Sequence, residues 1–124
     1  MVIARTLVIN AILNGCSEAD IDRAIEHSTI EEINKLDGSG RSALHHAAER
    51  DMSGTVAKLL AIGANPDILC LANTKGYFGK TAYEIACKGL HGPTIFQFLK
   101  VRFPVFLHEI RLKIESYEKF PVIG

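Results

Sequence analysis

The chain repeats part of its own pattern after 39 residues. The recurring elements are Ser42-x-x-His45 with Ala47-Ala48, Val56-x-x-Leu59-Leu60, Thr81-x-x-Glu84 with Ala86-Cys87, and Ile95-x-x-Phe98-Leu99. Self-similarity at a period of roughly 20 to 50 residues is typical of solenoids, in which each unit must stack on a neighbour to bury its apolar face. The pattern therefore predicts a stack of helix pairs, and it favours binding as the function.

Start and stop signals divide the chain into short helices. An apolar stripe in residues 2 to 14 predicts a helix that caps the N-terminal end. Ser17 and a capping box that begins at Ser28 predict two short antiparallel helices within residues 17 to 38. Gly63 is expected to take a left-handed conformation just past the end of a later helix.

A family resemblance is carried by residues 40 to 67. The sequences SALHHAA, LL and GANPD in this segment are similar to the pattern TPLHxAA, LL and GADxN of the ankyrin repeat. Residues 79 to 100 match less well, with Glu84 in place of the family's usual histidine, and residues 17 to 38 form a degenerate unit. The resemblance implies an all-α ankyrin solenoid of about three helix pairs, and it implies a binding role without a particular ligand.

We expect a single domain over residues 1 to 124, because a hydrophobic content of 48% over this length suffices for one core. Residues 1 to 38 would hold the N-terminal cap and the degenerate unit, residues 39 to 78 the clearest repeat with a long finger, and residues 79 to 102 the next repeat. Residues 103 to 124 are expected to form a C-terminal capping helix. The side chains that recur there at helical spacing are Phe106, Ile110, Ile114 and Tyr117.

Residues 64 to 80 lack helical periodicity, and we call them the finger loop. In an ankyrin-like chain this segment would be the hairpin that projects between two units. The spacing of 39 residues exceeds the family period of about 33, so the finger is expected to be enlarged. The resemblance also implies that His45 forms a structural hydrogen bond across the junction between units.

The finger loop and the inner helices are expected to bind a protein partner. Leu69, Leu71, Tyr77 and Phe78 lie outside the helical pattern, and exposed apolar patches usually mark an interaction site. An alternative of equal weight is that these four side chains fold back onto the second unit. The polar residues expected to complete the surface are His46, Glu49, Arg50, Asn73, Lys75 and Lys88.

Composition indicates which classes of partner and which cellular compartments are compatible with the sequence. The 14 basic and 14 acidic residues cancel, so no net charge attracts nucleic acid or an anionic membrane. Cys16, Cys70 and Cys87 fit no disulfide framework, which favours a reducing compartment. No stretch approaches the roughly 20 apolar residues of a membrane span. We expect a cytoplasmic protein, with the host-cell cytosol as an alternative because small bacterial effectors are among the ankyrin proteins that the chain resembles.

Motifs for catalysis, metals and cofactors are weak. His45 and His46 point about 100 degrees apart on a helix, and the sequence contains no CxxC motif and no pair of histidines at i, i+4. We therefore predict a non-catalytic adaptor or inhibitor that uses no metal or cofactor and acts as a monomer or weak homodimer. Two alternatives stay open, a small hydrolase with a Cys/His pair that includes Cys87, and a nucleic-acid binder. The lysines available to the second alternative are Lys75, Lys80 and Lys88.

Overall fold

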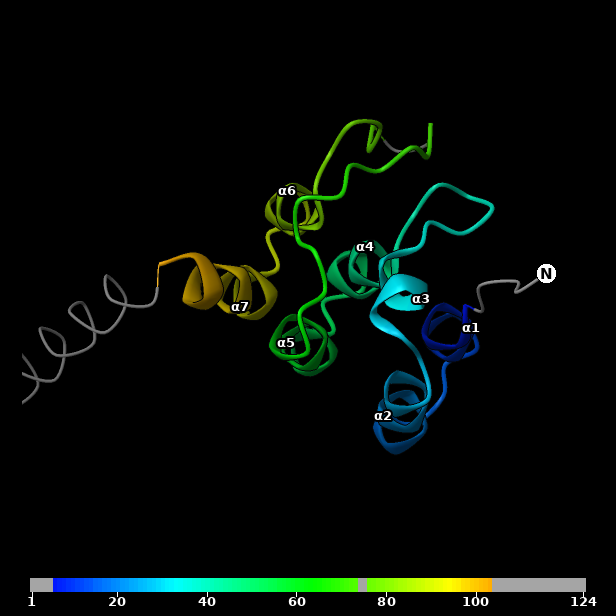
Figure 1. Ribbon diagram of the computed structural model, residues 1–124. Helices are drawn as coiled ribbons and strands as arrows, with labels where there is room; N and C mark the ends of the chain where they lie inside the picture. Colours follow the sequence, from blue (N-terminus) through cyan, green and yellow to red (C-terminus); the bar gives the residue numbers. More distant parts are fainter. Residues whose placement is uncertain (1–5, 74–75, 104–124) are drawn as a thin grey trace, which may run out of the picture.

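The computed structural model describes residues 6 to 73 and 76 to 103, and each regular element in this part of the chain is an α-helix (Figure 1). The predicted all-α class is confirmed for these residues. The C-terminal capping helix predicted beyond Phe103 lies outside the described residues. The helices are α1 (Leu7–Leu13), α2 (Glu18–Glu26), α3 (Ile30–Asn34), α4 (Ala43–Glu49), α5 (Ser53–Ala61), α6 (Ala82–Lys88) and α7 (Gly92–Arg102).

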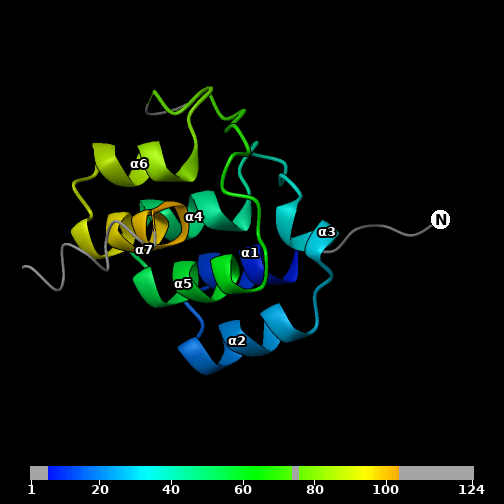
Figure 2. The same ribbon diagram turned by 60° about the vertical axis from the view of Figure 1, so that its left-hand side comes forward.

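Six of these helices form two rows, which Figures 1 and 2 show from two directions. In one row α4 lies between α1 and α6 and contacts both, and in the other α5 lies between α2 and α7. Each helix of the first row also packs on its successor in the second, so the pairs are α1 with α2, α4 with α5, and α6 with α7. The short helix α3 lies in the connection between α2 and α4.

The three pairs share one type of turn. A residue with positive φ follows the first helix of each pair, at Gly15 (φ 67°), Asp51 (φ 54°) and Leu90 (φ 57°). These residues are 36 and 39 positions apart, so the spacing seen in the sequence separates the second and third turns. The next amide in each case donates to the carbonyl five residues earlier: Cys16 to Ala11 (3.1 Å), Met52 to Ala47 (2.9 Å) and His91 to Ala86 (3.0 Å).

The first pair differs from the sequence-based prediction. The pattern pairs two helices within residues 17 to 38, whereas in the structure α1 pairs with α2. The helix expected to act as a separate cap in residues 2 to 14 is thus the first member of a pair. α3 cannot replace it, because α3 is 5 residues long and buries only Ile33. Gly15 was the available signal, since it occupies the same turn position as Asp51.

Side-chain caps fix where several helices begin. Ser42 and Thr81 open α4 and α6, as predicted, and each takes part in a capping box. The box of α3 begins at Thr29, one residue later than predicted. The hydroxyl of Ser28 instead donates to a carbonyl of α2 (2.7 Å). Gly63 takes a φ of 96° beyond α5, which confirms the predicted left-handed residue.

The core lies between the two rows. Ala47 and Ala48 of α4 and Ala86 of α6 have no exposed surface, and such small side chains allow the helices of the first row to approach closely. Val56 and Leu59 of α5 are equally inaccessible to solvent. Burial of a large aliphatic side chain contributes about 1.5 to 3 kcal/mol. The buried core therefore stabilises the helices from which the loops project.

Candidate functional site

The finger loop and the loop between α3 and α4 project from the same side of the helix rows (Figures 1 and 2). Backbone hydrogen bonds close the finger loop, because the amide of Cys70 donates to the carbonyl of Lys80 (2.8 Å) and the amide of Gly79 donates to that of Cys70 (2.7 Å). The amide of Leu71 donates to the carbonyl of Gly40 (2.8 Å), which ties the two loops together. The finger loop is thus held both at its base and against its neighbour.

Gly40 permits the close approach of the two loops. Its φ is 84°, a conformation that side chains with a Cβ rarely adopt. A Cβ there would also lie 2.7 Å from both the amide nitrogen of Ala72 and the carbonyl carbon of Leu71. The junction therefore requires glycine for two separate reasons.

One side of the finger loop is buried. Cys70 and Ala72 are 0% and 6% exposed and form a small cluster with Ile85 of α6. Tyr77 packs on this cluster and is half-buried. Tyr77 therefore folds back onto the stack, but against Ile85 of α6 in the third pair, whereas the alternative placed it on the second unit.

The other apolar side chains of the finger loop are exposed. Leu69, Leu71 and Phe78 are 52%, 58% and 62% exposed, as the binding hypothesis requires. Leu69 and Leu71 flank the buried Cys70 in sequence, and their side chains remain outside the cluster formed on α6. Asn73 is also exposed. Lys75 lies outside the described residues.

Tyr77 is held between charged groups. The guanidinium carbon of Arg41 lies 5.7 Å from its ring centroid, and the ammonium of Lys88 lies 5.3 Å from it. Cations at this distance from an aromatic face are attracted by about 0.5 to 2 kcal/mol. Lys88 is exposed, as predicted. These contacts connect the finger loop with α6 and with the loop before α4.

His45 joins α4 to the next loop, as the ankyrin resemblance implied. The amide of Ser42 donates to His45 Nδ1 (3.0 Å), so the opposite nitrogen, Nε2, carries the proton and donates to the carbonyl of Lys80 (3.2 Å). Burial lowers the pKa of His45, which keeps the ring neutral as these bonds require. One ring therefore serves the cap of its own helix and the base of the finger loop.

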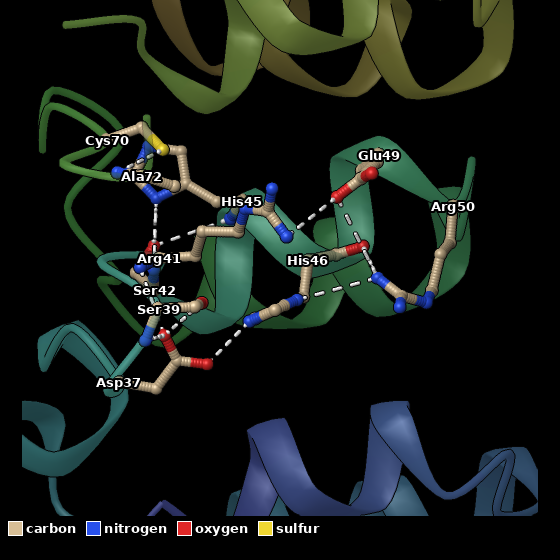
Figure 3. Close-up of polar contacts among 10 residues, drawn as sticks. All are labelled: Asp37, Ser39, Arg41, Ser42, His45, His46, Glu49, Arg50, Cys70 and Ala72. Atoms are coloured by element: carbon tan, nitrogen blue, oxygen red, sulfur yellow. Dashed lines mark hydrogen bonds and ion pairs between the residues drawn. The ribbon is translucent and has the colours of Figure 1, made fainter. Parts of the chain in front are cut away.

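The prediction that His46 faces solvent is wrong. This histidine is 2% exposed, and Figure 3 shows its ring between Asp37 and Arg50. Its Nε2 donates to Asp37 Oδ2 (2.8 Å), while Arg50 Nη1 approaches Nδ1 at 3.4 Å. The loop before α4 carries Asp37 over the helix face that was expected to be open. His46 therefore attaches this loop to α4 and does not belong to an exposed surface.

Asp37 is the centre of the polar contacts that motif analysis did not identify. Its Oδ1 accepts from the amide and hydroxyl of Ser39 (2.9 and 2.6 Å) and from the amide of Arg41 (3.1 Å). Burial alone would raise the pKa of Asp37, but these bonds and the bond from His46 outweigh it and hold the pKa at about 2. The sequence Asp37-Gly38-Ser39 was the available signal, because it is typical of a turn stabilised by an aspartate side chain.

Glu49 is also less accessible than predicted. Its side chain is 13% exposed and lies 3.7 Å from Arg41 and 4.0 Å from Arg50. The two arginines cover it, because a carboxylate that leaves water needs positive partners. Arg50 itself is 41% exposed, in agreement with the prediction. The accessible charge on this part of α4 is therefore positive.

The candidates for catalysis have other contacts. Both His45 and His46 are engaged as described, and the thiol of Cys87 pairs with the hydroxyl of Tyr83, which raises the pKa of that tyrosine. Among residues 6 to 73 and 76 to 103, no group of three or more histidine, cysteine, aspartate or glutamate side chains is placed to hold a metal ion.

A separate hollow of about 490 Å³ lies where α5, α6 and α7 meet. Phe98, Leu99 and Phe103 contribute to its apolar wall, and Arg102 pairs with Asp67 at its rim (2.8 Å). No residue of the predicted binding surface lines it. Pro66 and Asp67 at the start of the finger loop do line it, so the hollow adjoins the finger loop without sharing a predicted binding residue.

Comparison of the chain with protein-family models, with curated proteins and with solved structures found no match. Within the described part of the chain, no helix has both the length and the apolar character needed to cross a membrane.

Proposed function

We propose that the chain is a short ankyrin-like stack of three helix pairs. Three features support this proposal: the two rows of helices, the turn that recurs at Gly15, Asp51 and Leu90, and the loops that project from one side. The bond from His45 to the base of the finger loop is the role that the ankyrin resemblance gives this position. In this interpretation the two loops are successive fingers, of which residues 64 to 80 form the longer.

We further propose that the protein is a non-catalytic interaction module that binds another protein through the finger loop. The observation that carries this proposal is the combination of a fixed backbone with exposed apolar side chains. Leu71 shows both, because its amide is bonded to Gly40 while its side chain is 58% exposed. Phe78 is 62% exposed beside the equally fixed Gly79. A surface held in its bound conformation loses little entropy on association, and large apolar residues dominate binding energy.

The proposal can be tested by affinity capture with quantitative mass spectrometry. Leu71→Ser/Phe78→Ser removes two exposed apolar side chains from the finger loop. Ile62→Ser/Phe96→Ser is the matched control. These residues are 47% and 49% exposed and lie at the end of α5 and in α7, away from the finger loop. We expect a bound protein that is lost from the finger variant and retained by the control, with both variants melting like the wild type. Equal recovery by all three baits would contradict the proposed site.

A further inference from the structure

A groove lies between the returning limb of the finger loop and α6. Its volume is about 510 Å³, and it is lined by Tyr77, Lys80, Glu84, Ile85, Cys87 and Lys88. Both elements supply charge, Lys80 from the finger loop and Glu84 and Lys88 from α6. The side chain of Lys80 is 48% exposed, whereas Ile85 of α6 is 2% exposed. Phe78, the most exposed large side chain of the described finger loop, lies between Tyr77 and Lys80 in sequence.

The carboxylate in this groove is already engaged. Glu84 Oε1 accepts from the amide of Thr81 (3.2 Å) and from its hydroxyl (3.3 Å), and Oε2 lies 3.7 Å from the ammonium of Lys80. These contacts fix Glu84 as the cap of its own helix. Lys80 and Lys88 are exposed residues and carry two positive charges against the single negative charge of Glu84, so the groove presents a net positive charge.

Arg41, 15% exposed just before α4, and Arg50, 41% exposed just after it, extend the positive charge beyond the groove. Arg41 approaches the ring of Tyr77 and also pairs with Glu49, whose other flank is covered by Arg50. The side chain of Glu49 is 13% exposed and that of Arg50 is 41% exposed. A ligand that lies along the groove toward α4 would therefore meet cations, with the nearby carboxylates turned to internal partners.

We propose that this groove binds an acidic peptide segment of the partner protein, one that carries carboxylates next to a large apolar side chain. The carboxylates would contact Lys80 and Lys88, and the apolar side chain would pack against Phe78. Charge complementarity of this kind fixes the register of a complex and speeds association. The inference rests on the proposed function, since it specifies which protein segment the finger loop binds.

A nucleic acid is also anionic, but the groove fits it less well. Binding of single strands relies on aromatic rings that stack on bases. The ring of Tyr77 is already in contact with Arg41 and Lys88, which leaves Phe78 as the one exposed ring of the described finger loop on which a base could stack. The chain also has no net charge to bind phosphates non-specifically. The observations therefore favour a peptide.

The experiment is selection of a random peptide library on the immobilised full-length chain. Lys80→Glu/Lys88→Glu reverses the charge of the groove. Lys35→Glu/Lys100→Glu changes the net charge by the same amount at exposed positions outside the groove, and Phe78→Ser removes the apolar contact. Circular dichroism and thermal melting show whether each variant folds. We expect the wild type to enrich peptides with aspartate or glutamate beside phenylalanine, leucine or tryptophan.

A labelled copy of the most enriched peptide then allows titration of all four proteins. We expect at least about tenfold weaker binding to the groove reversal and to Phe78→Ser, with the control reversal unchanged. Enriched peptides that are neutral or basic would overturn the inference and leave the proposed function standing. If no peptide is enriched, the inference also falls, and the affinity capture described above decides the proposed function separately. Tight binding of a single-stranded oligonucleotide that the groove reversal abolishes would replace the peptide with a nucleic acid.

Discussion

The second and third helix pairs have the same turn and the same type of capping box, but they differ in burial. Six of the 7 residues of α4 are buried, against three of the 7 residues of α6. α4 has a row neighbour on each side, α1 and α6, whereas the row neighbour of α6 among the described helices is α4. The repeated sequence pattern therefore specifies helices and turns, while burial depends on what stacks against each unit.

His45 and Glu84 show the same difference at equivalent positions. Each is the third residue of its helix and returns a hydrogen bond to the cap. The ring of His45 has a second nitrogen, which reaches Lys80 at the base of the following loop. Glu84 bonds to Thr81, within its own cap. A side chain with two opposed polar atoms can link units, and a carboxylate here stabilises only the helix that carries it.

Truncation of buried side chains should give the largest difference in stability loss between the second and third helix pairs. Leu59→Ala in α5 removes a side chain with no exposed surface, and we expect a loss of about 3 kcal/mol in the free energy of unfolding. Leu99→Ala in α7 removes a half-buried side chain, so its effect should be about half as large. Urea unfolding with unchanged m-values would measure both. Equal losses would show that the third pair is as well covered as the second.

Substitution of the two capping residues, His45 and Glu84, should give the next largest difference in stability loss. His45→Ala leaves the amide of Ser42 without its partner, removes one of the two donors to the carbonyl of Lys80 and opens a cavity, so we expect a loss of about 2 kcal/mol. Glu84→Ala removes an exposed capping contact and should cost about 0.5 to 1 kcal/mol. Paired denaturant melts would measure the difference. A larger effect at Glu84 would contradict the linking role of His45.

Acid should weaken the contacts that Asp37 and His45 make around α4. The folded pKa of Asp37, about 2, lies below its ordinary value of 3.8. Its stabilising contribution is therefore complete above pH about 4 and is lost as the pH falls through 2, with a total of about 2 kcal/mol. His45 also has a lowered pKa, so its contribution declines as the pH falls below its ordinary value of 6.5.

Stability measured against pH for the wild type, Asp37→Asn and His45→Gln would resolve these contributions. We expect Asp37→Asn to flatten the curve below pH about 4, and His45→Gln to reduce the loss of stability that begins as the pH falls below 6.5. Unchanged curves in both variants would mean that neither side chain has the environment described.

Substitution of two glycines with positive φ, Gly63 and Gly40, should give the smallest difference in stability loss. Gly63→Ala should cost about 1 kcal/mol, because its φ of 96° is unfavourable for alanine although nothing lies within 4 Å of the added carbon. Gly40→Ala should cost more, because the carbon also meets the backbone of Leu71 and Ala72. We expect the amide of Leu71 to lose its protection in the second variant alone. Equal effects of the two substitutions would show that the loops move apart without penalty.

Local features of the fold could be predicted from sequence, because caps and turns depend on a few adjacent residues. Ser42, Thr81 and Gly63 behave as their local sequence indicates. The pairing of α1 with α2 was missed, since the apolar stripe of α1 is compatible with a separate capping helix or with a repeat unit. Only the turn at Gly15 distinguishes the two, and it shares little sequence with the turn at Asp51.

The candidate site could be predicted only in part, because some of its residues are buried by contacts with residues distant in sequence. Leu69 and Phe78 are exposed because they lie outside the stack, and loss of helical periodicity is visible in the sequence. The burial of His46 depends on Asp37, nine residues earlier, and that of Tyr77 depends on contacts with distant cations. Contacts of this kind arise from the arrangement of loops over helices, which residue spacing does not specify.

Amide hydrogen exchange across the finger loop tests the central claim most directly, namely that a fixed backbone presents exposed apolar side chains to a partner. The account predicts that the amides of Cys70, Leu71 and Gly79 exchange slowly, at rates close to those within α4, because each donates to a carbonyl in the loops. The amide of Asn73 should exchange faster, since among residues 6 to 73 and 76 to 103 it donates no backbone bond to either loop. Exchange of all four at the rate of an unstructured peptide would contradict the account.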